Sequence, residues 1–188
     1  MTLTRVEGNK VFEIDGRPAV DVWREVTGCT DAQVNDQDYV STWAGGVRPK
    51  LDAPPPPDDS VYVIRAAFGF DLDAGALIVQ AAIPEGTRVM FHLRTVPDVT
   101  EGTRQMARDL AARLAGARPW CVLGFECGAR TAPFLGQART VEENLALRRA
   151  VAPETPWLGL LAWGEIAPFG ETLAFHNYSY PLVALMEG

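Results

Sequence analysis

The stretch that decides the fold is residues 76–94, with the sequence ALIVQAAIPEGTRVMFHLR. Both ends of this stretch are rich in β-branched and aromatic residues, and Pro84-Glu85-Gly86 lies between them as a turn signal. After the turn, Val89, Phe91 and Leu93 alternate with other residues at the period of a half-buried strand. Two such runs joined by three turn residues predict an antiparallel β-hairpin over residues 76–94.

Further strands are predicted on both sides of this hairpin. Apolar runs typical of strands occur at 11–14, 61–64, 120–125, 158–163 and 178–186. A first helix is expected from Pro18, which suits the first helical turn, to Gly28, which can take the left-handed conformation after it. The polar stretch from Thr30 to Trp43 predicts a second, short helix.

Two longer helices follow. Asp98 and Glu101 have the spacing of a capping box, and the helix is expected over 99–115, packed on the hairpin's sheet through Met106, Leu110 and Leu114. Thr140 to Glu143 forms a second capping box and opens a helix that ends before Pro153.

The predicted strands outnumber the helices, and the one clear local pairing is antiparallel. We therefore expect an α+β fold with a mainly antiparallel sheet and helices packed on one face. A length of 188 residues favours one domain over 1–188. The proline-rich segment 52–59 is expected to be a surface segment inside it, with a domain boundary there as the alternative.

Composition narrows the partners and the compartment. With 24 acidic and 17 basic residues the net charge is −7. Such a chain repels phosphate backbones and anionic lipids, which excludes nucleic acid and membrane surfaces as first hypotheses. No apolar run is long enough for a spanning helix, so no membrane insertion is expected. Three cysteines predict a reducing, cytoplasmic location without disulfides.

Common catalytic and cofactor motifs are missing from the sequence. It contains neither a phosphate-binding loop of the G-x-x-x-x-G-K-S/T type, nor a G-x-G-x-x-G fingerprint, nor a G-x-S-x-G elbow. The chain has only two histidines, His92 and His176, and its cysteines lack zinc-knuckle spacing. We expect no cofactor and no metal.

Three clusters at the ends of predicted strands hold the candidate site residues, which are Cys127, Arg130, Glu165, His176 and Asn177. Each also has a structural interpretation. Cys127 suits the core as a small buried side chain. Arg130 can pair with Glu126 or Glu165, Glu165 can stabilise a turn, and the His-Asn pair can bond neighbouring loop backbone.

In this order the clusters resemble the C-terminal domain of the FIST family of bacterial sensory proteins. The matching residues are 125–130 with Leu135-Gly136, the segment from Gly159 through Gly164-Glu165-Ile166, and His176-Asn177, together with the opening residues 8–9 and 13–19. This resemblance spans most of the chain. It implies a sensory domain of a signal-transduction protein that binds a small ligand, with an amino acid as the favoured class. An N-terminal FIST-type domain normally accompanies it.

An amino acid needs a donor for its carboxylate and an anion for its ammonium. We expect Arg130 and Glu165 to supply these in one cleft, with His176 and Asn177 at its rim and Cys127 as a further candidate for ligand binding. The chain is not expected to be an enzyme. Two alternatives stay open: a structural or protein-interaction module without a ligand, and an enzyme that uses Cys127 and His176 as thiolate and base.

Overall fold

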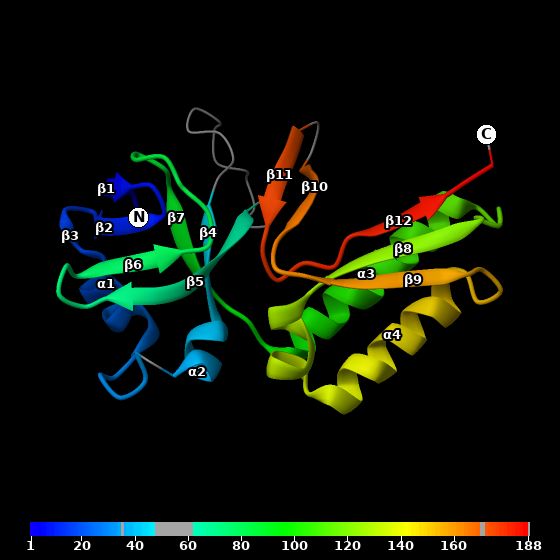
Figure 1. Cartoon of the computed structure of the whole chain (residues 1–188), viewed down its shortest axis with the longest axis horizontal. Coiled ribbons are helices and arrows are strands. Elements are labelled where there is room, and N and C mark those ends of the chain that lie inside the picture. Colours follow the sequence, from blue (N-terminus) through cyan, green and yellow to red (C-terminus); the bar gives the residue numbers. More distant parts are fainter. Residues whose placement is uncertain (35, 48–61, 170–171, 188) are drawn as a thin grey trace. The chain divides into compact units, whose positions relative to one another are not determined.

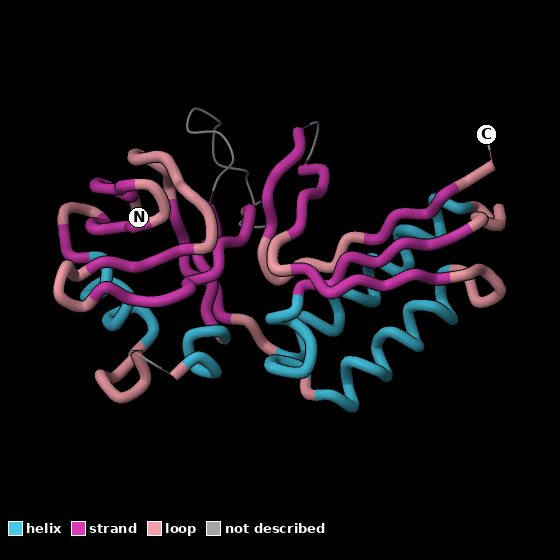
Figure 2. Tube along the Cα trace, in the orientation of Figure 1, coloured by secondary structure: helices cyan, strands magenta, loops and turns pink. Residues whose placement is uncertain are grey.

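The computed structural model describes residues 1–34, 36–47, 62–169 and 172–187. The protein has an α+β fold in which most strand pairs are antiparallel. Figure 2 shows where the helices and strands lie along the trace. The chain divides into two compact units: unit 1 comprises Met1–Arg94 with Pro168–Asn177, and unit 2 comprises Thr95–Ala167 with Tyr178–Gly188. Sequence length alone favours one domain, and no shift in composition marks the places where the two units part.

A seven-stranded antiparallel sheet forms most of unit 1 (Figure 1). Its strands are β1 (Leu3–Glu7), β2 (Lys10–Ile14), β3 (Arg17–Pro18), β4 (Trp43–Val47), β5 (Val63–Asp71), β6 (Ala76–Val79) and β7 (Val89–Leu93). The order is β1-β2-β6-β5-β4-β7, with β3 paired to β2. The sheet curls so that its two edge strands, β1 and β7, approach each other. At this junction the backbones of Met1 and Val89 exchange hydrogen bonds of 3.2 and 2.9 Å.

The predicted hairpin over residues 76–94 is wrong in its pairing. Strand β6 lies between β2 and β5, whereas β7 pairs with β4. The connection between β6 and β7 crosses to the first strand instead of turning back, because Gly86 donates its N–H to Leu3 and Leu3 donates to Thr87. Ile83 in this connection is buried in the core. Burial of that side chain and the bonds to Leu3 outweigh the local turn signal.

Strand β6 does belong to a hairpin, but its hairpin partner is β5. Its turn is held by the N–H of Ala74, which donates to Asp71 Oδ1 at 3.1 Å. Gly75 follows with φ of +65°, a conformation in which glycine avoids the strain of a side chain.

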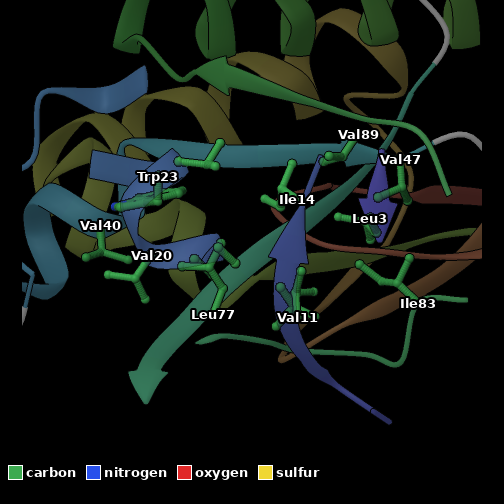
Figure 3. Packing of buried hydrophobic residues seen from close by; sticks show 14 of the residues in the cluster. Leu3, Val11, Ile14, Val20, Trp23, Val40, Val47, Leu77, Ile83 and Val89 are labelled. Carbon is green, nitrogen blue, oxygen red and sulfur yellow. The ribbon is translucent and has the colours of Figure 1, made fainter. Parts of the chain in front are cut away.

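The core of unit 1 lies between the sheet and the helix α1 (Ala19–Thr27), as Figure 3 shows. Trp23 is completely buried there and meets Phe70 and Phe91 edge-on, with ring centroids 5.8 and 5.2 Å away. Pro18 is the N-cap of α1 and lies just before the first helical turn in which it was predicted, whereas Gly28 ends the helix with φ of +70°, as predicted. The short helix α2 (Gln37–Ser41) is the one expected between Thr30 and Trp43.

Unit 2 has a three-stranded sheet with two long helices. Its elements are α3 (Val96–Leu114), β8 (Cys121–Cys127), a 3₁₀ turn (Gly128–Arg130), a π-helical turn (Thr131–Leu135), α4 (Gln137–Val151), β9 (Trp157–Ala162) and β12 (Leu182–Leu185). The strand order is β12-β8-β9. Strand β12 is antiparallel to β8, but β8 and β9 are parallel because α4 carries the chain back between them.

Helix α3 belongs to unit 2 and not to the sheet that contains β6 and β7, contrary to the sequence prediction. It also starts earlier: Thr95 is the N-cap, and its hydroxyl oxygen accepts the N–H of Asp98 at 3.2 Å. Pro97 fits this first turn because it has no N–H to satisfy. The buried side of α3 consists of Thr103, Ala107 and Leu114, while Met106 and Leu110 are only half-buried.

Helix α4 begins at Gln137 after Gly136, three residues before the predicted capping box. Thr140 does not cap it, because the threonine hydroxyl donates to the carbonyl of Gly136 at 3.0 Å. Glu143, expected to turn back to the helix start, is buried and points inward to another partner.

Both helices cover the same face of the unit 2 sheet (Figure 1). Along β8, Val122, Gly124 and Glu126 are buried, whereas Leu123 and Phe125 on the other face are only half-buried. Strand alternation therefore places Glu126 on the helix side of the sheet.

Strands β10 (Glu165–Phe169) and β11 (Thr172–His176) pair with each other, and the chain passes from unit 2 to unit 1 within β10. The proline-rich segment 52–59 lies outside the described residues. Strands on either side of it, β4 and β5, pair directly with each other in unit 1.

Candidate functional site

A buried ion cluster forms where β8 ends in unit 2. The Arg130 guanidinium lies 2.6 Å from Glu126 Oε1 and 2.6 Å from Glu143 Oε2. The three side chains are 3%, 7% and 8% exposed for Arg130, Glu126 and Glu143 respectively. Arg130 also donates a hydrogen bond to the hydroxyl of Thr103 on α3. A single guanidinium thus joins the sheet to both helices.

The cluster has more negative than positive groups, because two carboxylates share one guanidinium. Burial raises the pKa of the Glu126 carboxyl above its usual value, and the nearby Glu143 raises it further, against the opposite effects of Asn144 and Arg130. Glu143 Oε2 is held by the ion pair, but Glu143 Oε1 is buried without a hydrogen-bond partner. An unsatisfied buried carboxylate oxygen is costly, so it needs an explanation.

The cluster continues toward the sheet as a chain of hydrogen bonds. Asn144 donates to Glu126 Oε2 and to the carbonyl of Thr140, each at 3.0 Å, and Tyr180 donates its O–H to Asn144 Oδ1 at 2.5 Å. Burial raises the pKa of Tyr180 to about 12, with a further contribution from Glu126. The Tyr180 ring also lies 5.5 Å from the Arg130 guanidinium, within range of a cation–π contact. Each of these groups therefore fixes its neighbour.

A cavity of about 830 Å³ lies between α3 and α4, next to the ion cluster. Its walls include the small or apolar side chains of Ala107, Leu135 and Leu147, and Thr103 and Glu143 of the cluster also line it. Arg104, Arg108 and Arg139 line it from exposed positions. A mostly apolar cavity of this size with a few fixed polar groups is the usual form of a small-molecule site.

The five residues predicted from the sequence fall into separate groups. Arg130 takes part in the ion cluster, so the alternative that it pairs with Glu126 is the one seen. No contact between Arg130 and Glu165 occurs in the described part of unit 2.

Cys127 and Glu165 are brought together near Ser179. The N–H of Cys127 donates to the Ser179 carbonyl at 3.0 Å, and the Ser179 hydroxyl donates to Glu165 Oε2 at 2.8 Å. Glu165 Oε1 also accepts the N–H of Gly164 at 3.2 Å. Burial raises the pKa of the Cys127 thiol, and the negative charge of Glu165 raises it further. The surroundings therefore disfavour a thiolate.

His176 and Asn177 belong to unit 1. Asn177 Oδ1 accepts the N–H of Ala66 at 3.0 Å, and its Nδ2 donates to Gln80 Oε1 at 2.6 Å. Asn177 is 2% exposed and ties the returning segment to β5. His176 is half-buried at the end of β11.

The sequence reasoning missed four residues of the cluster and its extension, which are Thr103, Glu143, Asn144 and Tyr180. Two signals could have found part of it. Glu126 and Arg130 are four residues apart, and Glu143 and Asn144 follow one another on the inner side of a helix whose start was misplaced by three residues.

The described residues contain neither a candidate metal site nor a helix that could span a membrane. In those ranges no group of three or more His, Cys, Asp or Glu side chains is arranged to hold a metal ion. Among the helices in the same ranges, none is both long and apolar enough to cross a bilayer. Cys29, Cys121 and Cys127 are all free thiols.

Known proteins resemble this chain over nearly its whole length. It is 25% identical over 189 aligned residues to the uncharacterized protein Mb0898c of Mycobacterium bovis and, to the same extent, to the uncharacterized protein MT0897 of Mycobacterium tuberculosis. Each alignment covers 98% of this chain but 46% of the relative, so the chain spans about half the length of these relatives. No solved structure matches it significantly.

The sequence profile of the FIST C domain matches residues 19–168. This range includes the ion cluster, the residues that line the cavity and the larger part of each unit. Since the match covers most of the chain, the protein belongs to the FIST C domain family.

Proposed function

We propose that this chain is the sensory part of a signal-transduction protein and binds a small ligand in the cavity between α3 and α4. One observation carries the proposal: a cavity of about 830 Å³ is lined by Glu143, whose buried Oε1 has no partner in the protein. A ligand group that donates a hydrogen bond would satisfy this oxygen once the Glu143 side chain turns it toward the cavity. The FIST C domain match supports the sensory role.

An amino acid is the ligand class that we propose within this role. Its ammonium can meet Glu143, its side chain can lie against apolar walls such as Leu147, and its carboxylate can face Arg139 at the rim. The Arg130 guanidinium is already engaged by two carboxylates, so it acts in this proposal as the support of Glu143. Roles for Cys127, Glu165, His176 and Asn177 in ligand binding stay predictions.

We also infer the setting in which this module works. The family resemblance implies an N-terminal FIST-type domain as partner, and the relatives have more than half of their length outside the region that matches this chain. A cytoplasmic location fits the three free thiols, and the net charge of −7 disfavours nucleic acid as a partner.

The test is a binding screen with the twenty amino acids, by thermal shift and then by titration calorimetry. A true ligand raises the melting temperature and binds at one site. Ala146→Phe adds a large side chain at an exposed position lining the cavity and should abolish binding. Ala112→Phe, at an exposed position of α3 outside the cavity, is the matched control and should bind normally. Binding that survives Ala146→Phe would place the site elsewhere.

Two alternatives remain distinguishable. If no amino acid or other small metabolite shifts the melting temperature, a structural or protein-interaction module is the better account. An enzyme based on Cys127 and His176 predicts rapid alkylation of Cys127 by iodoacetamide near neutral pH. The raised pKa of this thiol predicts slow alkylation instead.

A further inference from the structure

We infer that the cavity between α3 and α4 selects its ligand by a positive charge, so that an organic ammonium or amidinium group is the recognised feature and a ligand carboxylate is dispensable. This inference rests on the proposed function, because it assumes that the cavity binds a ligand. It goes further by naming the positively charged group as the part of the ligand that the protein recognises.

The ion cluster beside the cavity has an excess of negative charge. Glu126 and Glu143 are more than nine-tenths buried, and one guanidinium, that of Arg130, is shared between them. Arg130 has each of its terminal nitrogens committed, one to Glu126 and the other to Glu143 and Thr103. It therefore has no free edge for a ligand carboxylate. A second cation at this place would neutralise the excess charge, whereas an anion would add to it.

An unsatisfied oxygen of Glu143 favours the same kind of ligand group. Glu143 Oε1 is buried and accepts no hydrogen bond, although its side chain lines the cavity. A carboxylate oxygen can only accept, so the missing partner must be a donor. Among small-molecule donors an ammonium or amidinium binds a buried carboxylate best, because its hydrogen bond is charge-assisted.

The arginines that line the cavity do not reverse this preference. Arg104 and Arg108 are already paired with Glu101, and these three side chains are 56–64% exposed. Interactions between exposed charges are screened by water and salt and contribute little to binding. A ligand carboxylate near Arg139 would gain equally little, since Arg139 is also exposed. Selectivity therefore depends on the buried group.

The test compares three ligands with one carbon skeleton by titration calorimetry at neutral pH. Each amino acid that binds in the screen is matched with its decarboxylated amine and with its deaminated acid; for leucine these are 3-methylbutylamine and 4-methylpentanoate. We expect the amine to bind within about tenfold of the amino acid and the acid to bind at least about tenfold more weakly than either.

Two variants assign the effect to Glu143. Glu143→Gln should weaken amine binding by tenfold or more and leave the weak binding of the acid unchanged. Glu143→Asp keeps the negative charge and should therefore retain part of the affinity for the amine. If this variant also loses all binding, altered folding or geometry is the cause rather than loss of the charge. Asp109→Asn removes the same charge from an exposed position of α3 that does not line the cavity. It should change neither the affinity for the amine nor the affinity for the acid.

The outcomes separate this inference from the proposed function. If amino acids and acids bind in the cavity but amines do not, the charge selection is wrong and the ligand-binding role stands. If Glu143→Gln is folded and binds amines as well as the unaltered protein does, Glu143 is not the recognising group. If no compound of any charge binds, both proposals fail together.

Discussion

The Arg130 guanidinium lies 2.6 Å from the Glu126 carboxylate inside unit 2, where the two side chains come from the end of a strand and from the turn that follows it. Together with Glu143 and Thr103, this pair connects the sheet of the unit to both of its helices. Its position explains why a residue expected to bind a ligand serves first to hold the fold together.

Replacing Arg130 by lysine should therefore destabilise the protein. A single ammonium cannot reproduce the planar fork that contacts Glu126, Glu143 and Thr103 together. Because lysine keeps the charge but loses hydrogen bonds to buried groups, we expect the free energy of unfolding to fall by about 1–3 kcal/mol, measured by urea denaturation with circular dichroism. Arg113→Lys at an exposed position of α3 is the control and should change it little. Equal stability of Arg130→Lys and the unaltered protein would return Arg130 to the list of ligand-binding candidates.

The Glu126 carboxyl should make stability depend on pH in a defined direction. Its pKa is raised above the usual 4.5, chiefly by burial, so the folded protein binds this proton more tightly than the unfolded chain does. The resulting stabilisation is fully present below the usual pKa and is lost as the pH rises through the raised value. Urea unfolding from about pH 4 to pH 7 should show this loss for the unaltered protein relative to Glu126→Gln. Parallel pH profiles of the two proteins would contradict the shift.

Two paired glycines of the unit 2 sheet should respond oppositely to alanine. A Cβ on Gly124 would lie 3.0 Å from the ring of Tyr180, whereas one on Gly159 would meet nothing within 4 Å. The Tyr180 ring cannot move aside easily, because its hydroxyl is bonded to Asn144. Gly124→Ala should cost about 1–3 kcal/mol, and Gly159→Ala should be neutral or stabilising by up to about 1 kcal/mol. Thermal unfolding of the two variants gives the comparison, and equal melting temperatures would show that Tyr180 does not constrain this site.

Asn177 should protect one amide of unit 1 from exchange. Its Oδ1 accepts the N–H of Ala66, and that amide would lose its partner in Asn177→Ala. We expect a loss of about 1–3 kcal/mol in stability and much faster hydrogen exchange at Ala66 by nuclear magnetic resonance. Asn177→Asp retains the accepting oxygen and should preserve more of the protection. Unchanged exchange at Ala66 in Asn177→Ala would show that another group satisfies this amide.

The fold class followed from the sequence, but the pairing of strands did not. Alternation in Val89, Phe91 and Leu93 correctly identified a strand, because this pattern is local. Its partner β4 lies more than forty residues earlier in the chain, and the bonds that redirect the connection join Gly86 and Thr87 to the still more distant Leu3. No short pattern contains that information.

The candidate site, like the fold, could be predicted from the sequence only in part. The spacing of Glu126 and Arg130 allowed their pairing to be considered from the sequence. Thr103 and Tyr180 join them from separate elements, so only the tertiary structure brings them together. Glu143 was misinterpreted for a physical reason: a threonine and a glutamate three residues apart predict a capping box, and the preference of Arg130 for a second carboxylate overrides it.

The division of the chain between the two units also determines when each unit can complete its folding during synthesis. Unit 1 is completed by Pro168–Asn177, and unit 2 by the residues after Tyr178, which include the edge strand β12. A ribosome releases the chain from its N-terminus, so β8 emerges long before β12 can cover its free edge. Neither unit reaches its final form before residues 168–185 have been translated, and the nascent chain exposes an unpaired strand edge until then.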